Sequence, residues 1–548
     1  MATSGLHSSC RNISSMFKGD LMHLSSIWSS QEEPTSQQLR EPTWKRKMFM
    51  PADLPAFDDS LSVPDVRSKW TPLDYFSEYY DDNYWQLVSE QTNIRGLQDE
   101  PMVELKTTPD EIKQFVGSLV VLGCLRLPRI RLCYRPILKI PAVTHIPRDR
   151  LFKLRNYLHF VNNLDITAEE KQTNKLWKVT PILKRFRDAC TKLPRSQNVC
   201  VDEQMIPFSG TTSLRQYAPG KPNPIGLKNF ILLSPRGVVL DFVIYQGMET
   251  WPNGLPEPTV GIRGSVVLKL SETLTAGTQL YFDRYFTSIP LLDKLKDKGI
   301  LASGTIMMSN LRERQQLATD KSLKDRGWGS YDELVRSDES MALTKWMDNR
   351  SLVVASTIHG SHPETQVMRY SKKDKGYIQV TMPHAIDAYN LNMGAVDMCD
   401  RMISYYRICT RTKKWPVRVF FHFIDMALVN SWFQYVQDCE YFGVVKKNIM
   451  DLLDFRLYVG EALVISRGPK RKSLDDGREI VRIPRQPLPN RDMRRSGGLH
   501  LPVVGTESNN FQRCRKPGCS KTSRIMCTSC NVFFCVQPDR NCFYEFHT

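Results

Sequence analysis

The sequence predicts a mixed α/β core that is interrupted by a polar segment, flanked by helical segments and followed by a small cysteine-rich unit. Three observations lead to this prediction. The hydrophobic period changes from helical to strand-like near Asn198. A long polar stretch, residues 310–383, then separates two parts of the strand-and-helix pattern. Six of the 14 cysteines lie between Cys514 and Cys542, and clustered cysteines are typical of metal ligands.

The N-terminal part of the chain divides into two regions. Residues 1–65 are rich in Ser, Gln, Glu and Pro without sustained periodicity, so we expect them to be mostly disordered. Residues 66–196 are predicted to form the first part of a helical region. Its clearest helix spans 108–123, where Thr108 is an N-cap followed by proline and two acidic residues. Further helices are expected over 148–160 and 179–190.

The predicted core begins with short apolar runs that alternate with helical ones. Residues 197–309 form its first part, with strands expected at 199–202, 230–233, 237–245, 279–283 and 299–304. Helices are expected over 261–274 and from Ser288. The gap that follows is long for a compact domain, so we interpret residues 310–383 as an insertion, with its clearest strand at 352–357.

The helical pattern then returns and completes the predicted organisation. A helix over 395–408 belongs to the second part of the core, residues 384–408. A helix over 417–435 belongs to the second part of the helical region, residues 409–465. Residues 466–513 are predicted to be a basic linker, and residues 514–548 the cysteine-rich domain.

Composition narrows the class of partner. The net charge of +17 and the pI near 9.2 favour a polyanionic partner, most simply nucleic acid. No apolar run is long enough to span a membrane, so no membrane partner is expected. The polar N-terminus lacks the apolar segment of a secretory signal. No glycine-rich phosphate-binding or dinucleotide motif is present, so no nucleotide cofactor is expected.

Four aspartates form the candidate catalytic site. Asp202 and Asp283 each follow apolar residues at the expected end of a strand, and Asp397 and Asp400 are one helical turn apart. Carboxylates that converge from strands and a helix suit a two-metal site for phosphoryl transfer, with Mg²⁺ or Mn²⁺ as the hard cation. A single such aspartate is more often a turn former or a helix cap. Glu203 is expected to face away from its neighbours across the pleat.

The cysteine-rich tail is the candidate zinc domain. Thiolates with a closing histidine at these spacings indicate structural Zn²⁺, and so small a segment would depend on the metal to fold. Seven ligands leave the second site one short, so either a further group such as Asp539 or water completes that site, or the site is weakened. The predicted ligands are Cys514, Cys519, Cys527, Cys530, Cys535, Cys542 and His547.

Five motifs in one order resemble the piggyBac transposase family, including its domesticated derivatives. They are VDEQ at 201–204, DRYFTSIP at 283–290, MGAVDMCD at 393–400, RTKKWP at 411–416 and the cysteine-rich tail. The resemblance covers the chain from about residue 70 onward. Ala395 departs from the family, which usually has a second glycine there, and the interval from Cys535 to Cys542 is longer than in many relatives.

The resemblance implies an RNase H-like catalytic core with an insertion domain and a two-part helical region for DNA binding and dimerisation. It implies cut-and-paste transposition at TTAA sites, acting on the double-stranded DNA of transposon ends, by a nuclear homodimer. Asp202, Asp283 and Asp397 correspond to the family's catalytic aspartates, and Asp400 to an additional metal-proximal one. The tail resembles the family's cross-brace domain, which holds two zinc ions and contacts transposon-end DNA.

The basic segment after the third motif is the candidate DNA contact. Its charged side chains either contact phosphates or form a solvated face, and its tryptophan either stacks near the scissile DNA or anchors in the core. The run PKRK at 469–472 is a nuclear import signal or part of the linker. Two alternative functions are a domesticated DNA-binding protein and a zinc-dependent interaction module. The candidate DNA-binding residues are Arg411, Lys413, Lys414, Trp415 and Arg418.

Overall fold

The computed structural model describes residues 43–51, 57, 64–99, 105–138, 140–247, 249–250, 257–312, 316–465, 500–504, 511–530 and 532–548. The chain divides into two compact units, residues 1–468 and 469–548. Among the helices of the described ranges, none has the length and hydrophobicity required to cross a membrane. The motif at 469–472 lies outside the described residues.

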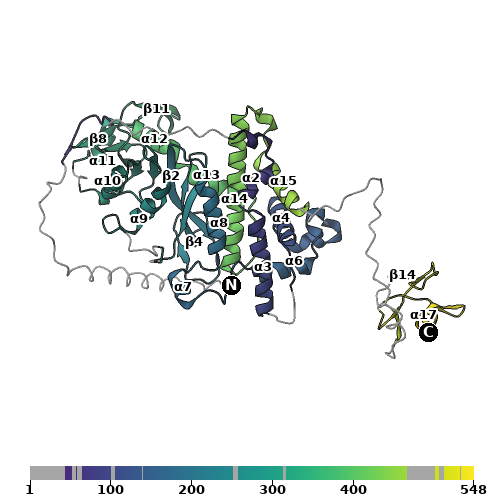
Figure 1. Ribbon diagram of the computed structural model, residues 1–548. Helices are drawn as coiled ribbons and strands as arrows, with labels where there is room; N and C mark the ends of the chain where they lie inside the picture. Colours follow the sequence, from purple (N-terminus) through teal and green to yellow (C-terminus); the bar gives the residue numbers. More distant parts are fainter. Residues whose placement is uncertain are drawn as a thin grey trace, which may run out of the picture. The chain divides into compact units, whose positions relative to one another are not determined.

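The first unit is built on a ten-stranded mixed sheet (Figure 1). Its order is β1-β8-β9-β10-β7-β6-β2-β4-β3, and β5 also pairs with β4. The central pairs β2–β6 and β6–β7 are parallel and the other pairs are antiparallel. The strands are β1 Trp44–Lys45, β2 Asn198–Pro207, β3 Arg215–Tyr217, β4 Ile225–Leu233, β5 Val239–Ile244, β6 Gln279–Phe282, β7 Leu301–Thr305, β8 Tyr331–Arg336, β9 Ala342–Met347 and β10 Ser351–Ser356.

Helices surround this sheet, and seven of those listed below begin near the positions predicted from the sequence. The Thr108 side chain accepts a hydrogen bond from the Glu111 N–H at the start of α4, which confirms the predicted N-cap. Helix α12 was not predicted. The helices are α2 Pro72–Ser77, α3 Asp82–Asp99, α4 Pro109–Leu125, α5 Pro141–Thr144, α6 Arg148–Tyr157, α7 Ala168–Thr173, α8 Thr180–Thr191, α9 Gly261–Leu270, α10 Ile289–Asp297, α11 Asp320–Arg326, α12 His384–Met393, α13 Ala395–Tyr405, α14 Trp415–Tyr441 and α15 Leu452–Ile465.

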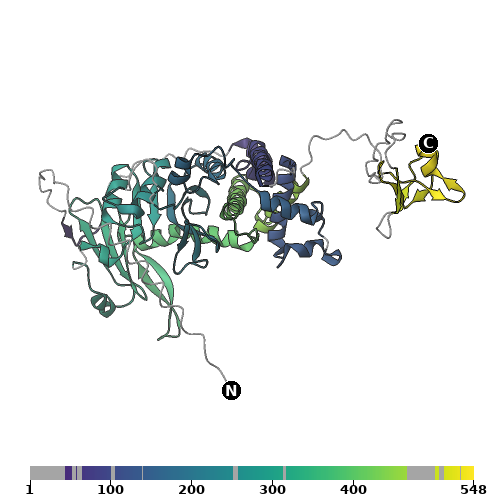
Figure 2. The ribbon, with the colours of Figure 1, turned by 90° about the horizontal axis from the view of Figure 1, so that it is seen from below.

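Helix α14 connects the sheet to the helical part of the unit. It runs between the strands and the helices α3, α4 and α15 (Figure 1), and Figure 2 looks along its axis. Asn430 fastens it to β5, because its side chain accepts from the Val239 N–H and donates to the Val239 carbonyl. Helices α4 and α15 cross closely, since a Cβ on Gly117 would lie 2.5 Å from the Gly460 carbonyl oxygen. Helices from residues 66–196 and 409–465 therefore pack together.

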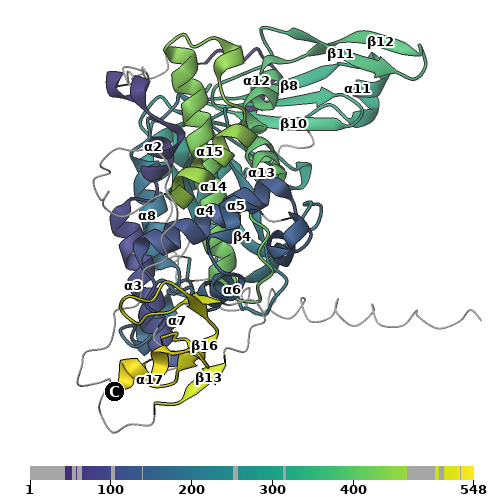
Figure 3. The same ribbon diagram turned by 90° about the vertical axis from the view of Figure 1, so that its right-hand side faces the viewer.

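Two expectations about strand segments need correction. Disorder was predicted for residues 1–65, but Trp44 is buried and pairs with Arg336 on β8. This pairing partner is almost 300 residues away, so local composition did not reveal it. Within 310–383, which was interpreted as an insertion, β10 pairs with β7, so that β8, β9 and β10 continue the main sheet. Only β11 (Thr365–Ser371) and β12 (Gly376–Met382) form their own hairpin (Figure 3).

The second unit contains short strand pairs and one terminal helix. Cysteines supply much of its buried interior, together with Val532, Phe534 and Phe546. The predicted linker 466–513 ends earlier than expected, because residues from His500 onward belong to this unit and β13 pairs with β16. The elements are β13 Pro502–Val504, β14 Gln512–Arg513, β15 Thr522–Ser523, β16 Ile525–Cys527, β17 Val536–Gln537, β18 Arg540–Asn541 and α17 Cys542–His547.

Candidate active site and metal-binding clusters

Asp202 and Asp283 lie on adjacent parallel strands at the centre of the sheet. Val201 on β2 pairs with Phe282 on β6, so the two aspartates are the next residues along neighbouring strands. Asp283 directly follows its strand, as predicted. The prediction that Asp202 also ends a strand is wrong, because pairing with β4 extends β2 to Pro207.

Asp397 and Asp400 lie one turn apart in α13, which packs against β2 and β4. Asp397 is exposed and Asp400 is partly buried. The Gln204 side-chain amide donates a 2.6 Å hydrogen bond to Asp400 Oδ1. Because Gln204 and Asp202 are two residues apart on β2, their side chains lie on the same face of the sheet. Asp400 therefore meets the face that carries Asp202.

These carboxylates influence one another electrostatically. Burial raises the pKa of Asp202 to about 6, and the charges of Asp283 and Glu203 add to the rise. Burial also raises the pKa of Asp283. The pKa of Asp400 is raised by burial, with a further contribution from the charge of Asp397. A nearby positive charge therefore favours the ionised form of these three buried carboxylates.

Lys221, in the loop between β3 and β4, provides such a charge. Its ammonium lies 3.7 Å from Asp202 Oδ2 and donates a 2.9 Å hydrogen bond to the Glu203 carbonyl. Its charge acts to lower the pKa of Asp202, Asp283 and Asp400. A cation thus already faces three of the four aspartates, and an all-oxygen ligand set of this kind suits Mg²⁺ or Mn²⁺.

Two tighter groups of potential ligands lie in the second unit. Within the described ranges, they are the groups of three or more His, Cys, Asp or Glu whose ligand atoms all lie within 4.8 Å of one another, and the four aspartates do not form such a group. The ligands of the two groups interleave along the chain: each pair of cysteines from one group is followed by one or more ligands of the other group. One contains Cys514, Cys519, Cys535 and Cys542, and the other contains His500, Cys527, Cys530 and His547.

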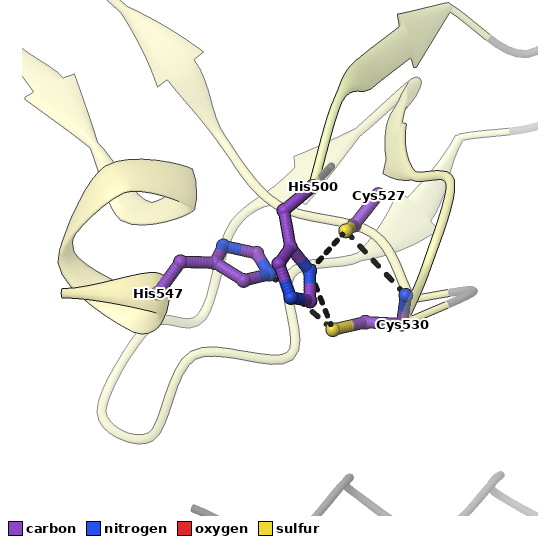
Figure 4. Close-up of side chains that lie close together, drawn as sticks. All are labelled: His500, Cys527, Cys530 and His547. Atoms are coloured by element: carbon purple, nitrogen blue, oxygen red, sulfur yellow. Dashed lines mark hydrogen bonds between the residues drawn. The ribbon is translucent and has the colours of Figure 1, made fainter. Parts of the chain in front are cut away.

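The mixed group converges from three elements (Figure 4). His500 Nδ1 lies 3.4 Å from the sulfurs of both Cys527 and Cys530, and His547 Nε2 lies 3.3 Å from the Cys530 sulfur. The His547 Nδ1 approaches the Phe543 carbonyl at 2.7 Å. This carbonyl fixes the proton on Nδ1, so Nε2 presents its lone pair to the cluster.

The all-cysteine group also has the properties of a metal site. A backbone N–H hydrogen bond from Lys521 lowers the pKa of Cys519 to about 7, whereas burial raises the pKa of Cys542 to about 12. Four thiols this close cannot all ionise without a compensating cation, because each thiolate repels the next. A thiophilic divalent ion would hold all four as thiolates.

His500 corrects the prediction for the eighth ligand. The prediction was that a further group such as Asp539 or water completes the second site, or that the site is weakened; the structure brings a further group to it, but that group is His500 and not Asp539. The residue lies 14 positions before the first cysteine of the tail and was assigned to the linker. The count of seven ligands was the one signal in the sequence that an eighth was missing.

Similar proteins identify the chain's relatives. It is 29% identical over 486 residues to the human PiggyBac transposable element-derived protein 3, covering 87% of this chain and 76% of that protein. It is 28% identical over 409 residues to the human PiggyBac transposable element-derived protein 2, covering 72% and 66%. A family model described as transposase IS4 matches residues 71–432. The chain belongs to the piggyBac transposase family.

The fold agrees with this piggyBac assignment. The cryo-EM structure of a piggyBac transposase synaptic complex with hairpin DNA matches with a TM-score of 0.60 and 22% sequence identity, covering 73% of this chain and 82% of that one. The residues matched by the family model include all four aspartates and most of α14.

The basic segment of this piggyBac family member is not uniformly exposed. Arg411, Lys413 and Lys414 are exposed, although the ammonium of Lys414 donates a 2.6 Å hydrogen bond to the Asn156 carbonyl. Trp415 is partly buried and packs against the main core. Burial lowers the pKa of Arg418, whose side chain donates to the Thr410 carbonyl at 3.4 Å. Three of the five candidates are thus tied to the protein.

Three residues near the aspartates were not predicted from the sequence. Gln204 lies two residues after Asp202, and that spacing on a strand was the available signal. Lys221 and His422 reach the site through tertiary contacts, and no local pattern marks them. Glu203, which was expected to face away from the aspartates, forms an ion pair with Lys228.

Proposed function

We propose that this protein is a piggyBac-like DNA transposase that cleaves and transfers strands of transposon-end DNA at TTAA sites in a metal-dependent reaction. The observation that supports this most directly is the convergence of Asp202 and Asp283 from adjacent parallel strands with the α13 aspartates on the same sheet. The mixed sheet fits an RNase H-like core of residues 197–309 and 384–408, interrupted by the 310–383 insertion.

Each residue has a distinct role in this proposal. Asp202, Asp283 and Asp397 would hold Mg²⁺ or Mn²⁺, and Asp400 would assist. A bound cation of this kind activates a water or a 3′-hydroxyl and stabilises charge on the leaving oxygen. Lys221 keeps the buried carboxylates ionised before DNA arrives, because its ammonium offsets their mutual repulsion.

An excision assay tests the proposed activity. Donor plasmids would carry candidate terminal sequences flanked by TTAA, and repaired excision products would be counted by sequencing. Asp283→Ala should reduce excision about 1,000-fold or more, because it removes one member of a cooperating set. Asp297→Ala, at an exposed position near the end of α10, is the matched control and should excise normally. If the wild-type protein excises none of the donors, the enzymatic proposal fails.

DNA is the proposed partner. The net charge of +17 supports a polyanionic ligand, and the similar solved structure is a piggyBac transposase synaptic complex with hairpin DNA. Arg411 and Lys413 are the best-placed phosphate contacts of the basic segment because they are exposed, whereas the ammonium of the exposed Lys414 is held by the Asn156 carbonyl. Lys414, Trp415 and Arg418 would serve mainly to hold that segment in place. A homodimer acting in the nucleus is part of the same proposal.

The tail is proposed to bind two Zn²⁺ ions through its two interleaved groups of four ligands. Each group has the thiolate or mixed thiolate and imidazole composition of a closed structural site. The zinc ions would stabilise the fold of this unit, which would contact transposon-end DNA.

A second candidate function is a transposase-derived nuclear DNA-binding protein that no longer transposes. The similarity to human proteins described as transposable element-derived favours it. Retention of all four aspartates favours the active enzyme. DNA binding without excision in the assay above would select this second function.

A further inference from the structure

A chain of buried hydrogen bonds lies behind Asp400 and joins three elements of the first unit. The Gln204 side chain on β2 donates to Asp400 Oδ1 at 2.6 Å. Its carbonyl oxygen, Oε1, lies 2.8 Å from His422 Nε2 on α14 and 3.3 Å from Asn229 Nδ2 on β4. Gln204 and Asn229 are fully buried and His422 is 4% exposed.

The chemistry of these groups fixes the direction of every bond. An ionised carboxylate only accepts hydrogen bonds, so the NH₂ end of Gln204 must face Asp400. Its oxygen then faces His422 and Asn229, which must both donate. We therefore assign the Nε2–H tautomer to His422. Burial lowers the pKa of His422 well below its usual value, and the charges of Arg407 and Arg418 act in the same direction, so the ring is neutral.

The network is also costly to break. Flipping Gln204 would place its NH₂ against the His422 N–H and its oxygen against a carboxylate, and buried amide atoms without a matching partner are destabilising. With Asp400 ionised, only this orientation of Gln204 matches a donor with an acceptor at each of its three contacts. The hydrogen bond from Gln204 to Asp400 Oδ1 restricts rotation of the carboxylate. It thereby restricts where the second oxygen, Oδ2, can lie.

We propose that Gln204 and His422 are positioning residues for Asp400, and that helix α14 thereby sets the geometry of the metal site. The inference rests on the proposed function, because it takes Asp400 to be a metal-proximal ligand. In metal sites, groups that hydrogen-bond the ligands typically change metal affinity 10- to 100-fold when they are removed. A role confined to core stability would change thermal unfolding but leave metal affinity in the folded protein unchanged.

Mn²⁺ binding to the full-length, zinc-loaded protein tests this inference. Affinity would be measured by electron paramagnetic resonance titration at a temperature where every variant is folded, and thermal unfolding would be recorded alongside. The site is defined as the Mn²⁺ signal that Asp283→Ala abolishes. Gln204→Met, which keeps the volume but removes both hydrogen-bonding atoms, should weaken binding at least about tenfold.

His422 variants separate a hydrogen-bonding role from a packing role. His422→Leu should weaken Mn²⁺ binding severalfold, whereas His422→Gln should restore it because an amide NH₂ can donate to Gln204. His359→Leu is the control: His359 is partly buried, and its Nε2 contacts the Tyr281 hydroxyl at 3.1 Å rather than this network. It should leave Mn²⁺ affinity unchanged.

The outcomes distinguish the two levels of the proposal. If wild-type protein shows no Asp283-dependent Mn²⁺ binding, the proposed function fails. If wild-type protein binds Mn²⁺ and Gln204→Met binds it equally well, the positioning role is wrong while the proposed function stands. If His422→Leu and His422→Gln behave alike, α14 does not act through the Nε2–H donor.

Discussion

The candidate metal sites of the two units differ in what holds their ligands in place. In the second unit, each group gathers four ligand atoms within 4.8 Å, and cysteines supply much of the interior. In the first unit, the aspartates are held by strands and a helix that belong to one extensive apolar core, and they do not gather so closely within the described residues. We therefore expect the tail unit to need a metal in order to fold, and the aspartate site of the first unit to be folded before a metal arrives.

The difference indicates which kind of work each ion does. Thiolates packed against one another are unfavourable until a cation binds, so binding energy becomes folding energy. Buried carboxylates on a rigid sheet are also unfavourable, but the apolar core tolerates that cost. Such a site is free to use its cation in chemistry. Four predictions test this contrast.

Removing zinc should have the largest effect, and it should be confined to the second unit. A structural zinc ion contributes on the order of 10 kcal/mol to folding, far more than the small core of this unit. We expect chelation in reducing buffer to expose residues 500–548 to limited proteolysis. Peptides from β2 and α14 should stay protected, as monitored by mass spectrometry.

The control for this experiment is addition of excess Zn²⁺ after chelation, which should restore protection. Cys409→Ser offers a matched variant, because Cys409 is an exposed cysteine outside both clusters. It should respond to chelation as the wild type does. A tail that resists proteolysis without metal would contradict the contrast between the two units.

The second prediction concerns the eighth ligand. His500→Ala should reduce the zinc content from two ions to one in native mass spectrometry, because the mixed group falls to three ligands. Asp539→Ala should retain both ions, since the structure brings His500, not Asp539, to the cluster. The reverse pattern, with zinc lost from the Asp539 variant, would restore the original expectation from the sequence.

The third prediction concerns the cost of burying Asp202. Its folded pKa of about 6 lies above the usual value of 3.8, so the folded state retains this proton at pH values where the unfolded state has lost it. The free energy of unfolding therefore falls as pH rises from about 4 to about 6. The difference between a pKa of about 6 and one of 3.8 corresponds to about 3 kcal/mol of stability lost when Asp202 ionises in the folded protein. An uncharged variant avoids this loss, but it also loses the contact with Lys221, which offsets part of the benefit.

Asp202→Asn should accordingly raise the free energy of unfolding by about 1–2 kcal/mol at pH 8 in metal-free protein. At pH 4 the variant and the wild type should differ little. Urea denaturation at both pH values measures this, with Asp297→Asn as an exposed control. Equal stability of Asp202→Asn and wild type at pH 8 would show that Asp202 does not carry the expected burial cost.

The sequence predictions were accurate where an element depends on neighbouring residues, and they failed where it depends on residues far away in the sequence. Helix α4 was predictable because its cap, proline and apolar face all lie within one segment, and Asp283 because it directly follows an apolar run. The extension of β2 past Asp202 depends on β4, and the burial of Trp44 depends on β8. His500 is separated from its cluster by 26 intervening residues, and Gln204 meets His422 only in the folded protein. Local patterns cannot encode such contacts.

The smallest expected effect concerns Lys221, whose positive charge lies close to the site proposed for the metal ion. Its ammonium faces the same carboxylates as the proposed cation, and like charges a few ångströms apart repel even in a partly solvated site. Lys221→Met should therefore tighten Mn²⁺ binding about threefold to tenfold, and added salt should reduce the difference because it screens the repulsion. Lys175→Met, which removes an ion pair with Glu249, is the control and should leave Mn²⁺ affinity unchanged. Weaker binding by Lys221→Met would mean that Lys221 supports the carboxylate geometry more than it competes with the metal, and the aspartate site would then resemble the tail in depending on a cation for its shape.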